Sequence, residues 1–124
     1  MRDQLIGVYD IGHEQVRLMV REGLGGEFGI YPSPTIWVGI QSPDWSLVWE
    51  SLLHESMEFV AFRKHVRYTP DTSRTSDHGA YFFAFNHSEF ADIVAKVALF
   101  TVPALPMLRV AHETYHSPRK TKKR

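Results

Sequence analysis

Residues 44–66 read DWSLVWESLLHESMEFVAFRKHV, and this stretch decides the fold. Apolar residues return every three or four positions, which predicts an amphipathic helix from about Trp45 to about Val66. Asp44 or Ser42 can cap its first turn. The side expected to face a sheet carries Trp49, Leu52, Leu53, Met57, Phe59 and Val60. The opposite, polar side carries Glu50, Ser51, His54, Glu55, Glu58 and His65.

Three strands are predicted before this helix. Residues 15–22 alternate Val16, Leu18 and Val20 with Arg17, Met19 and Arg21, the period of a half-buried strand. The glycines of residues 23–26 favour a turn, after which residues 27–31 can return as a partner strand. Residues 35–40 are β-branched and aromatic and form the third strand. The N-terminal third is therefore expected to be a sheet.

A second long helix is predicted after the central one. Residues 69–77 are polar and rich in chain breakers, so we expect an exposed loop there, followed by a short aromatic strand over residues 79–85. Asn86 and Glu89 have the spacing of a capping box that opens a helix. Pro103 and Pro106 are expected to kink or divide it, leaving a final helical segment at residues 107–116.

The order of these elements predicts an α+β fold: a mainly antiparallel sheet of about four strands, with the long central helix and a kinked C-terminal helix on one face. A length of 124 residues suits a single domain, which we assign to residues 1–117. Residues 118–124 are expected to be a basic, disordered tail.

Composition and charge indicate the cellular compartment of the protein and the kinds of partner it can bind. The chain has no cysteine, which favours a reducing compartment, and its first residues lack the apolar run of a signal peptide. The longest apolar run, residues 97–108, is interrupted by prolines and too short to cross a bilayer, so we expect a cytoplasmic protein without a membrane partner. Five of the 14 Lys and Arg residues lie in residues 119–124, and the other nine accompany 14 acidic residues. A basic tail on an acidic body can contact nucleic acid.

The central helix also carries a candidate metal site. Residues at positions i and i+4 point the same way from a helix, so His54 and Glu58 can supply a nitrogen and an oxygen ligand to one zinc ion. Glu55 can then act as the general base toward a metal-bound water. His87, at the start of the second helix, is the first candidate for a third ligand. His112 and His116 are alternatives, and an ordinary solvated polar face is the structural alternative.

This His-Glu-x-x-Glu segment resembles the signature helix of the zincin metallopeptidases, His-Glu-x-x-His, at His54 and Glu55. The resemblance covers residues 35–66 and includes a strand ahead of the helix, as at the edge of a zincin cleft. It implies a metal-dependent hydrolase acting on a peptide or another small substrate. Glu58 stands where the family has its second histidine, so a degenerate site is equally compatible with the pattern.

A literal His-Glu-x-x-His occurs at residues 112–116, with Glu113 in the position of the base. Pro118 and the basic tail follow at once, so a third ligand must come from upstream. A solvated helix end explains the same residues, because cations near a helix C-terminus complement its dipole.

Two functions therefore follow from the sequence. The first is a minimal zincin-like metal-dependent hydrolase, active or degenerate, with zinc at His54 and Glu58. The second is a non-enzymatic interaction or assembly protein whose basic tail contacts nucleic acid. The layout is also similar to that of small phage-encoded proteins, which favours the second function. Convergence of His54, Glu58 and another histidine beside a cleft is the feature that separates the two.

Overall fold

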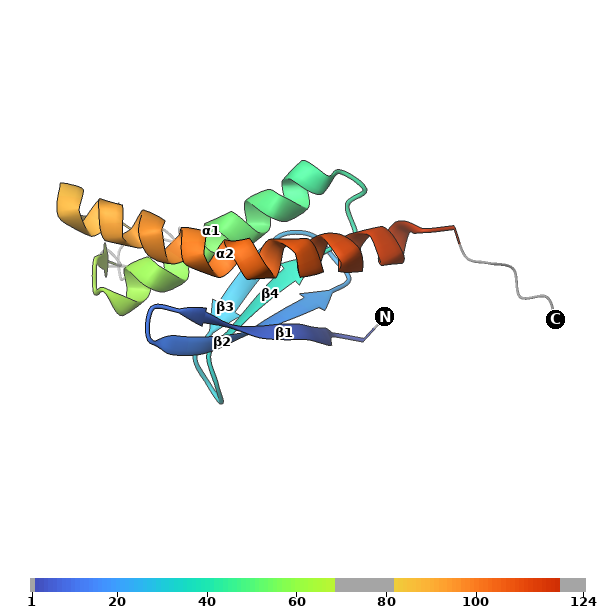
Figure 1. The fold of residues 1–124 in the computed structure, drawn as a ribbon, viewed down its shortest axis with the longest axis horizontal. Coiled ribbons are helices and arrows are strands. Elements are labelled where there is room, and N and C mark those ends of the chain that lie inside the picture. Colours follow the sequence, from blue (N-terminus) through green and yellow to red (C-terminus); the bar gives the residue numbers. More distant parts are fainter. Residues whose placement is uncertain (1, 69–81, 119–124) are drawn as a thin grey trace, which may run out of the picture.

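A four-stranded sheet covered on one face by two long helices makes up the protein (Figure 1). The structure is a computed structural model, and it describes residues 2–68 and 82–118. In chain order the elements are β1 (Gln4–Ile11), β2 (Glu14–Arg21), β3 (Gly26–Gly29), β4 (Thr35–Gly39), α1 (Trp45–Arg63), β5 (Arg67–Tyr68), β6 (Phe82–Phe83) and α2 (His87–His116). The predicted α+β class, with four strands and both helices on one face, is confirmed.

The strand order is β1-β2-β4-β3, so the sheet is mixed. β1 is antiparallel to β2, and β3 is antiparallel to β4, but β2 and β4 run parallel. The prediction that residues 27–31 pair with the preceding strand is wrong, because β4 inserts between β2 and β3. Gly39 allows this insertion: its N–H donates to the Gly25 carbonyl at 2.7 Å, and a Cβ there would lie 2.4 Å from the Gly23 carbonyl oxygen.

β1 was not predicted from the sequence. It lies at the edge of the sheet and leaves Leu5 and Val8 exposed, with a register shift between Leu5 and Gly7. A half-exposed, irregular strand lacks the clean alternation that reveals β2. In β2 the predicted alternation is confirmed, since Val16, Leu18 and Val20 are all buried.

α1 has the predicted extent within three residues and is capped by Asp44, which accepts from the Ser46 N–H at 3.0 Å. The predicted facing of this helix is correct for Leu52, Phe59 and Val60, which are buried, and wrong at the positions that follow. Trp49 and Met57 are exposed, while Glu55 and Ser56 are buried among Val48, Leu52, Phe59, Val60 and Ala61. The Ser56 hydroxyl tolerates burial because it donates to the Leu52 carbonyl at 2.8 Å.

α2 begins with the predicted capping box, in which Asn86 and Glu89 each bond the other's backbone N–H at 2.9 Å. Of the two predicted effects of the prolines, a kink or a division, division is wrong, since one 30-residue helix continues through Pro103 and Pro106. Both prolines lie on the exposed side, where water can reach the carbonyls that lose their donors. The helix therefore continues with those bonds missing.

α2 is also long and apolar enough to cross a membrane by length and composition alone, which the sequence had not led us to expect. In this fold one side of the helix is buried and the other is exposed. Ile93, Val97, Phe100, Ala104 and Leu108 form its buried face and join the residues of the sheet and of α1 in one hydrophobic core.

Parts of three predictions fall outside the described residues. These are the loop at residues 69–77, the first part of the strand at residues 79–85, and the basic tail apart from Pro118. The described end of that strand is β6, which pairs antiparallel with β5 in a separate two-stranded sheet.

Candidate functional site

The His54 motif occupies the middle of α1, where two of its residues bind each other. His54 Nε2 lies 2.6 Å from a Glu58 carboxylate oxygen and 3.9 Å from one of Glu55. The His54 side chain is more than half exposed, while the Glu55 and Glu58 side chains are largely covered. The i, i+4 convergence predicted for His54 and Glu58 is therefore present, as a direct histidine–carboxylate contact.

Glu55 does not lie on an open polar face as predicted, because α1 presents it to β3. A Cβ added to Gly26 would approach the Glu55 Cγ to 2.9 Å, so a glycine in β3 makes the room for this side chain. Glu55 and Glu58 line a shallow cavity of about 260 Å³ against β3. The predicted general base thus packs between helix and sheet.

An apolar pocket of about 220 Å³ opens beside His54 and Glu58. Its remaining walls come from Met57 and Ala61 on α1, and from Phe83, Phe85, Phe90 and Ile93 around the start of α2. Phe85 and Phe90 stack with ring centroids 6.0 Å apart. The pocket supplies shape and apolar surface, and among its described lining residues His54 and Glu58 are the polar ones.

The predicted third ligands are not at this pocket. His87 is exposed at the first position of α2 and does not line the pocket. His112 packs against the Trp45 ring, with 5.5 Å between centroids, and Trp45 lies ~13 Å along the axis of α1 from His54. His87 and His112 themselves are ~37 Å apart along α2. The histidines therefore belong to three separate regions of the fold.

His112 and His116 hold the connection between β4 and α1. His112 Nε2 lies 2.7 Å from the Ser42 carbonyl, and His116 Nε2 lies 2.8 Å from the Ile40 carbonyl. A carbonyl can only accept, so both Nε2 atoms are the protonated, donating nitrogens. Glu113 points elsewhere and pairs with Arg109 at 2.9 Å. The literal His-Glu-x-x-His therefore has a structural role at these atoms.

In the part of the chain that the structure describes, the candidate zinc ligands do not come together as a set of three. Within residues 2–68 and 82–118, no group of three or more His, Asp or Glu side chains is placed to hold a metal ion. Zinc sites in proteins use at least three protein ligands, and the pair of His54 and Glu58 supplies two. The zinc site stays a prediction from the sequence.

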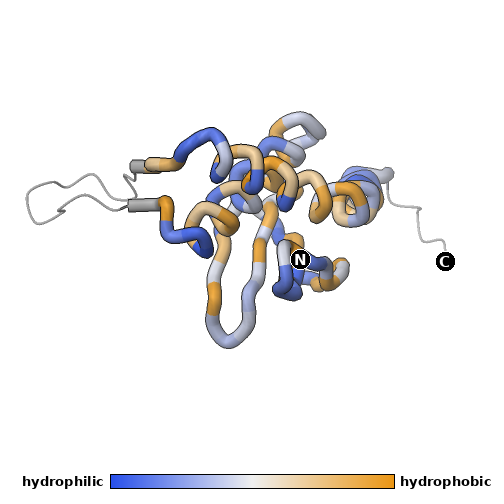
Figure 2. Tube along the Cα trace, turned by 60° about the vertical axis from the view of Figure 1, so that its left-hand side comes forward, coloured by the Kyte–Doolittle hydropathy of each residue, from blue (hydrophilic) through white to orange (hydrophobic). Residues whose placement is uncertain are grey.

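The outer side of α2 is the feature that sequence reasoning missed. From residue 90 to residue 108 every exposed residue of this helix is apolar. We call this set the α2 face: Phe90, Ala91, Val94, Ala95, Ala98, Leu99, Val102, Pro103, Pro106 and Met107. Leu99 and Val102 are each 74% exposed. In Figure 2, α2 is the helix that ends beside the C-terminus. Hydrophobic colour follows most of it, and hydrophilic colour returns at that end.

The charged residues within this span, Asp92 and Lys96, are partly exposed and pair with each other. The Asp92 carboxylate accepts from Lys64 Nζ, at the C-cap of α1, at 2.8 Å and from Lys96 Nζ at 2.7 Å. The hydrogen bonds from Lys64 and then from Lys96 lower the pKa of Asp92 to about 2. The three charges thus tie the start of α2 to the end of α1, and the charges nearest the α2 face neutralise each other.

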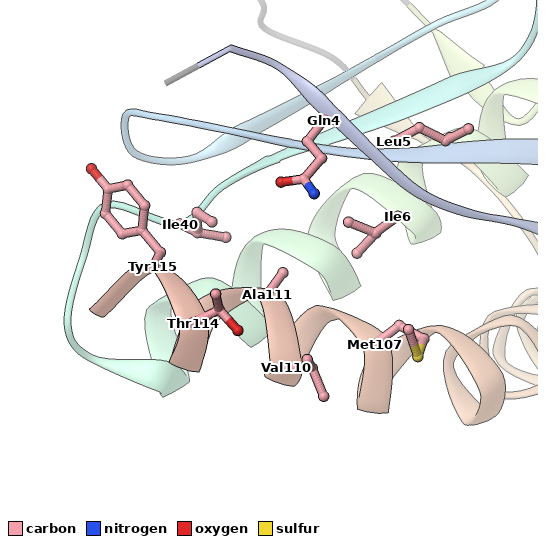
Figure 3. A pocket seen from close by; sticks show the side chains of 9 residues that line it. All are labelled: Gln4, Leu5, Ile6, Ile40, Met107, Val110, Ala111, Thr114 and Tyr115. Atoms are coloured by element: carbon pink, nitrogen blue, oxygen red, sulfur yellow. The ribbon is translucent and has the colours of Figure 1, made fainter. Parts of the chain in front are cut away.

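A groove of about 490 Å³ continues the α2 face toward the edge of the sheet. It runs between the start of β1 and the last turns of α2, with Gln4 and Ile6 turned toward the helix (Figure 3). Met107 belongs both to this groove and to the α2 face. All nine lining residues are uncharged. At the groove's end the Tyr115 hydroxyl donates to Glu22 at 2.9 Å, which lowers the pKa of Glu22 and raises that of Tyr115.

The signal for this surface was present in the sequence. Residues 90–108 contain only two charged residues, Asp92 and Lys96, and a helix with so few charges has too little polarity to cover its solvent side. Comparison with known proteins adds no assignment: no family model, no curated protein and no solved structure matches this chain.

Proposed function

We propose that this protein is a non-enzymatic interaction or assembly protein that binds a protein partner through the α2 face. The observation that supports this is that all ten exposed residues of the α2 face are apolar. Single exposed apolar residues are ordinary, but a continuous apolar surface on a folded domain marks an interaction site. Fully burying one Val, Leu or Phe side chain stabilises a complex by roughly 1.5–3 kcal/mol, so a few of these side chains would support binding.

The basic tail adds a second contact in this proposal. Residues 119–124 carry five positive charges, and neutralised phosphates release counterions when such a segment binds nucleic acid. The cytoplasmic location expected from the cysteine-free sequence belongs to the same proposal. A metal-dependent hydrolase is the less favoured function, because the described residues give His54 and Glu58 no third ligand.

Methionine oxidation in cells provides the test, because it reports whether the α2 face is covered. Met107 lies in the α2 face and is 45% exposed, while Met57 on α1 is 41% exposed and serves as a matched control. We expect hydrogen peroxide to oxidise Met107 more slowly in intact cells than in purified, dilute protein, because a partner shields the thioether. Met57 should show no such difference.

The proposal fails if Met107 and Met57 are oxidised at the same relative rates in cells and in dilute solution. The readout is mass spectrometry of the peptides that contain each methionine. A Met107→Leu variant, which keeps the apolar surface, identifies the Met107 signal without changing the chemistry of the α2 face.

A further inference from the structure

We infer that the partner on the α2 face is a second copy of this chain, so that two α2 helices pack against each other across a two-fold axis. This inference rests on the proposed function and names its partner. A two-fold interface uses the same surface patch on both copies, so the patch must be complementary to itself. The charge, size and backbone chemistry of the α2 face each bear on that requirement.

Charge is the first requirement. Near a two-fold axis a residue approaches its own counterpart, so any charged side chain there faces a like charge. The α2 face spans ~26 Å of helix and contains no charge along that length. The partly exposed Asp92 carboxylate pairs with both Lys64 and Lys96, and Arg109 and Glu113 pair with each other beyond the face. Because the charges beside the α2 face are paired with one another, they do not oppose self-association, and the face itself has no charge that would select a charged partner.

The available area is the second requirement. The outward half of a helix that is ~26 Å long and ~10–12 Å wide presents on the order of 500 Å² of accessible surface. Two copies then bury about 1,000 Å², which is near the lower limit for a specific interface. The groove beside Met107 extends this surface. The dimer is therefore expected to be weak and to depend on protein concentration.

The backbone argues against lipid as the occupant. Pro103 and Pro106 have no N–H to donate to the carbonyls of Leu99 and Val102, one turn earlier. These carbonyls lie in the middle of the α2 face, and an unsatisfied carbonyl in hydrocarbon is costly. A protein interface admits bridging waters that satisfy such groups. The same prolines that leave the helix continuous thus favour a protein surface over a bilayer.

The centre of the α2 face predicts where the two-fold axis passes. Residues 98 and 99 are at its midpoint, so antiparallel α2 helices bring Leu99 close to Leu99 of the second copy. The chain contains no cysteine, and a single introduced cysteine therefore reports without interference. A disulfide requires Cα atoms ~4.4–6.8 Å apart, so it forms only where two copies meet closely.

Sedimentation velocity of the full chain over a range of concentrations, together with mild oxidation of Leu99→Cys, provides the test. We expect a reversible dimer, and a disulfide-linked dimer from Leu99→Cys. Leu99→Glu should abolish the dimer at every concentration, because two carboxylates would meet at the axis. Leu24 is 72% exposed in the loop between β2 and β3, and Leu24→Glu and Leu24→Cys are the matched controls. They should leave the dimer intact and give no cross-link.

Several results would overturn this inference, and Met107 oxidation separates them from a failure of the proposed function. A wild-type monomer at all concentrations excludes the second copy. If Met107 is nevertheless protected in cells, the proposed function holds with a different protein; if it is unprotected, both fail. A monomer that co-sediments with phosphatidylglycerol vesicles and loses this binding in Leu99→Glu would assign the α2 face to lipid. A dimer that survives Leu99→Glu would place the interface elsewhere.

Discussion

Replacing Leu108 with alanine tests whether α2 is a core helix of the domain. Leu108 has no exposed surface and belongs to the central hydrophobic core. Removing a buried leucine side chain forfeits its transfer free energy and leaves a cavity, which together cost roughly 2–5 kcal/mol. The free energy of unfolding of a domain this size is about 5–15 kcal/mol, so the loss is a large part of the whole. At ~4 °C per kcal/mol for a chain of this length, Tm should fall by about 8–20 °C.

Leu99→Ala is the matched control, because it makes the same chemical change on the same helix. Leu99 is 74% exposed, and surface substitutions usually change the free energy of unfolding by no more than about 0.5 kcal/mol. Urea unfolding followed by far-UV circular dichroism, at a concentration where the protein is monomeric, measures both variants. Equal midpoints for Leu108→Ala and Leu99→Ala would refute the assignment of α2 to the core, and with it the definition of the α2 face.

Asp92→Asn should change how stability falls in acid. The lowered pKa of Asp92 means that its ionised carboxylate stabilises the fold above about pH 4, and this stabilisation is lost as the pH falls through about 2. Circular dichroism between those values should show a shallower loss in the variant than in the wild type; identical acid profiles would contradict this. Zinc analysis after purification distinguishes the two candidate functions. If the proposed function is correct, neither wild type nor His54→Ala should contain zinc. Zinc that is lost in His54→Ala and retained in Glu55→Gln would instead favour the metal-dependent hydrolase. Deleting residues 119–124 should leave Tm nearly unchanged and weaken nucleic-acid binding in a salt-dependent way; an unfolded truncation would refute the assignment of these residues to a tail.

The parts of the fold that follow local rules could be predicted from the sequence. The alternation in β2, the Asp44 cap of α1 and the capping box of Asn86 and Glu89 depend on a few neighbouring residues, and all are as expected. Strand pairing could not be obtained in this way. The insertion of β4 between β2 and β3 depends on a close contact between Gly39 and Gly23, which a one-dimensional pattern does not contain.

The candidate site was harder to predict because burial on α1 depends on its neighbours. Glu55 is accommodated by a glycine in β3, and Ser56 satisfies itself within the helix, so two polar residues occupy the inward side. The helical wheel correctly placed Leu52, Phe59 and Val60 on that side but added Trp49 and Met57, which are exposed. Likewise, the histidines at residues 112 and 116 matched a catalytic spacing but donate to the carbonyls of Ser42 and Ile40. The sequence shows the histidines of the motif, but it does not show the backbone carbonyls that they contact in the folded chain.

The packing of α2 along β1 has a consequence for how fast the chain reaches its native state. These elements start at residues 4 and 87, so their contact closes a loop of most of the sequence (Figure 1). Closing that loop costs conformational entropy before the contacts across it can stabilise the chain. Folding therefore slows as contacting residues become more distant in sequence. The parallel pairing of β2 with β4 is non-local in the same sense. We therefore expect this protein to fold more slowly than a helical bundle of equal length, with its last helix and first strand docking in the rate-limiting step.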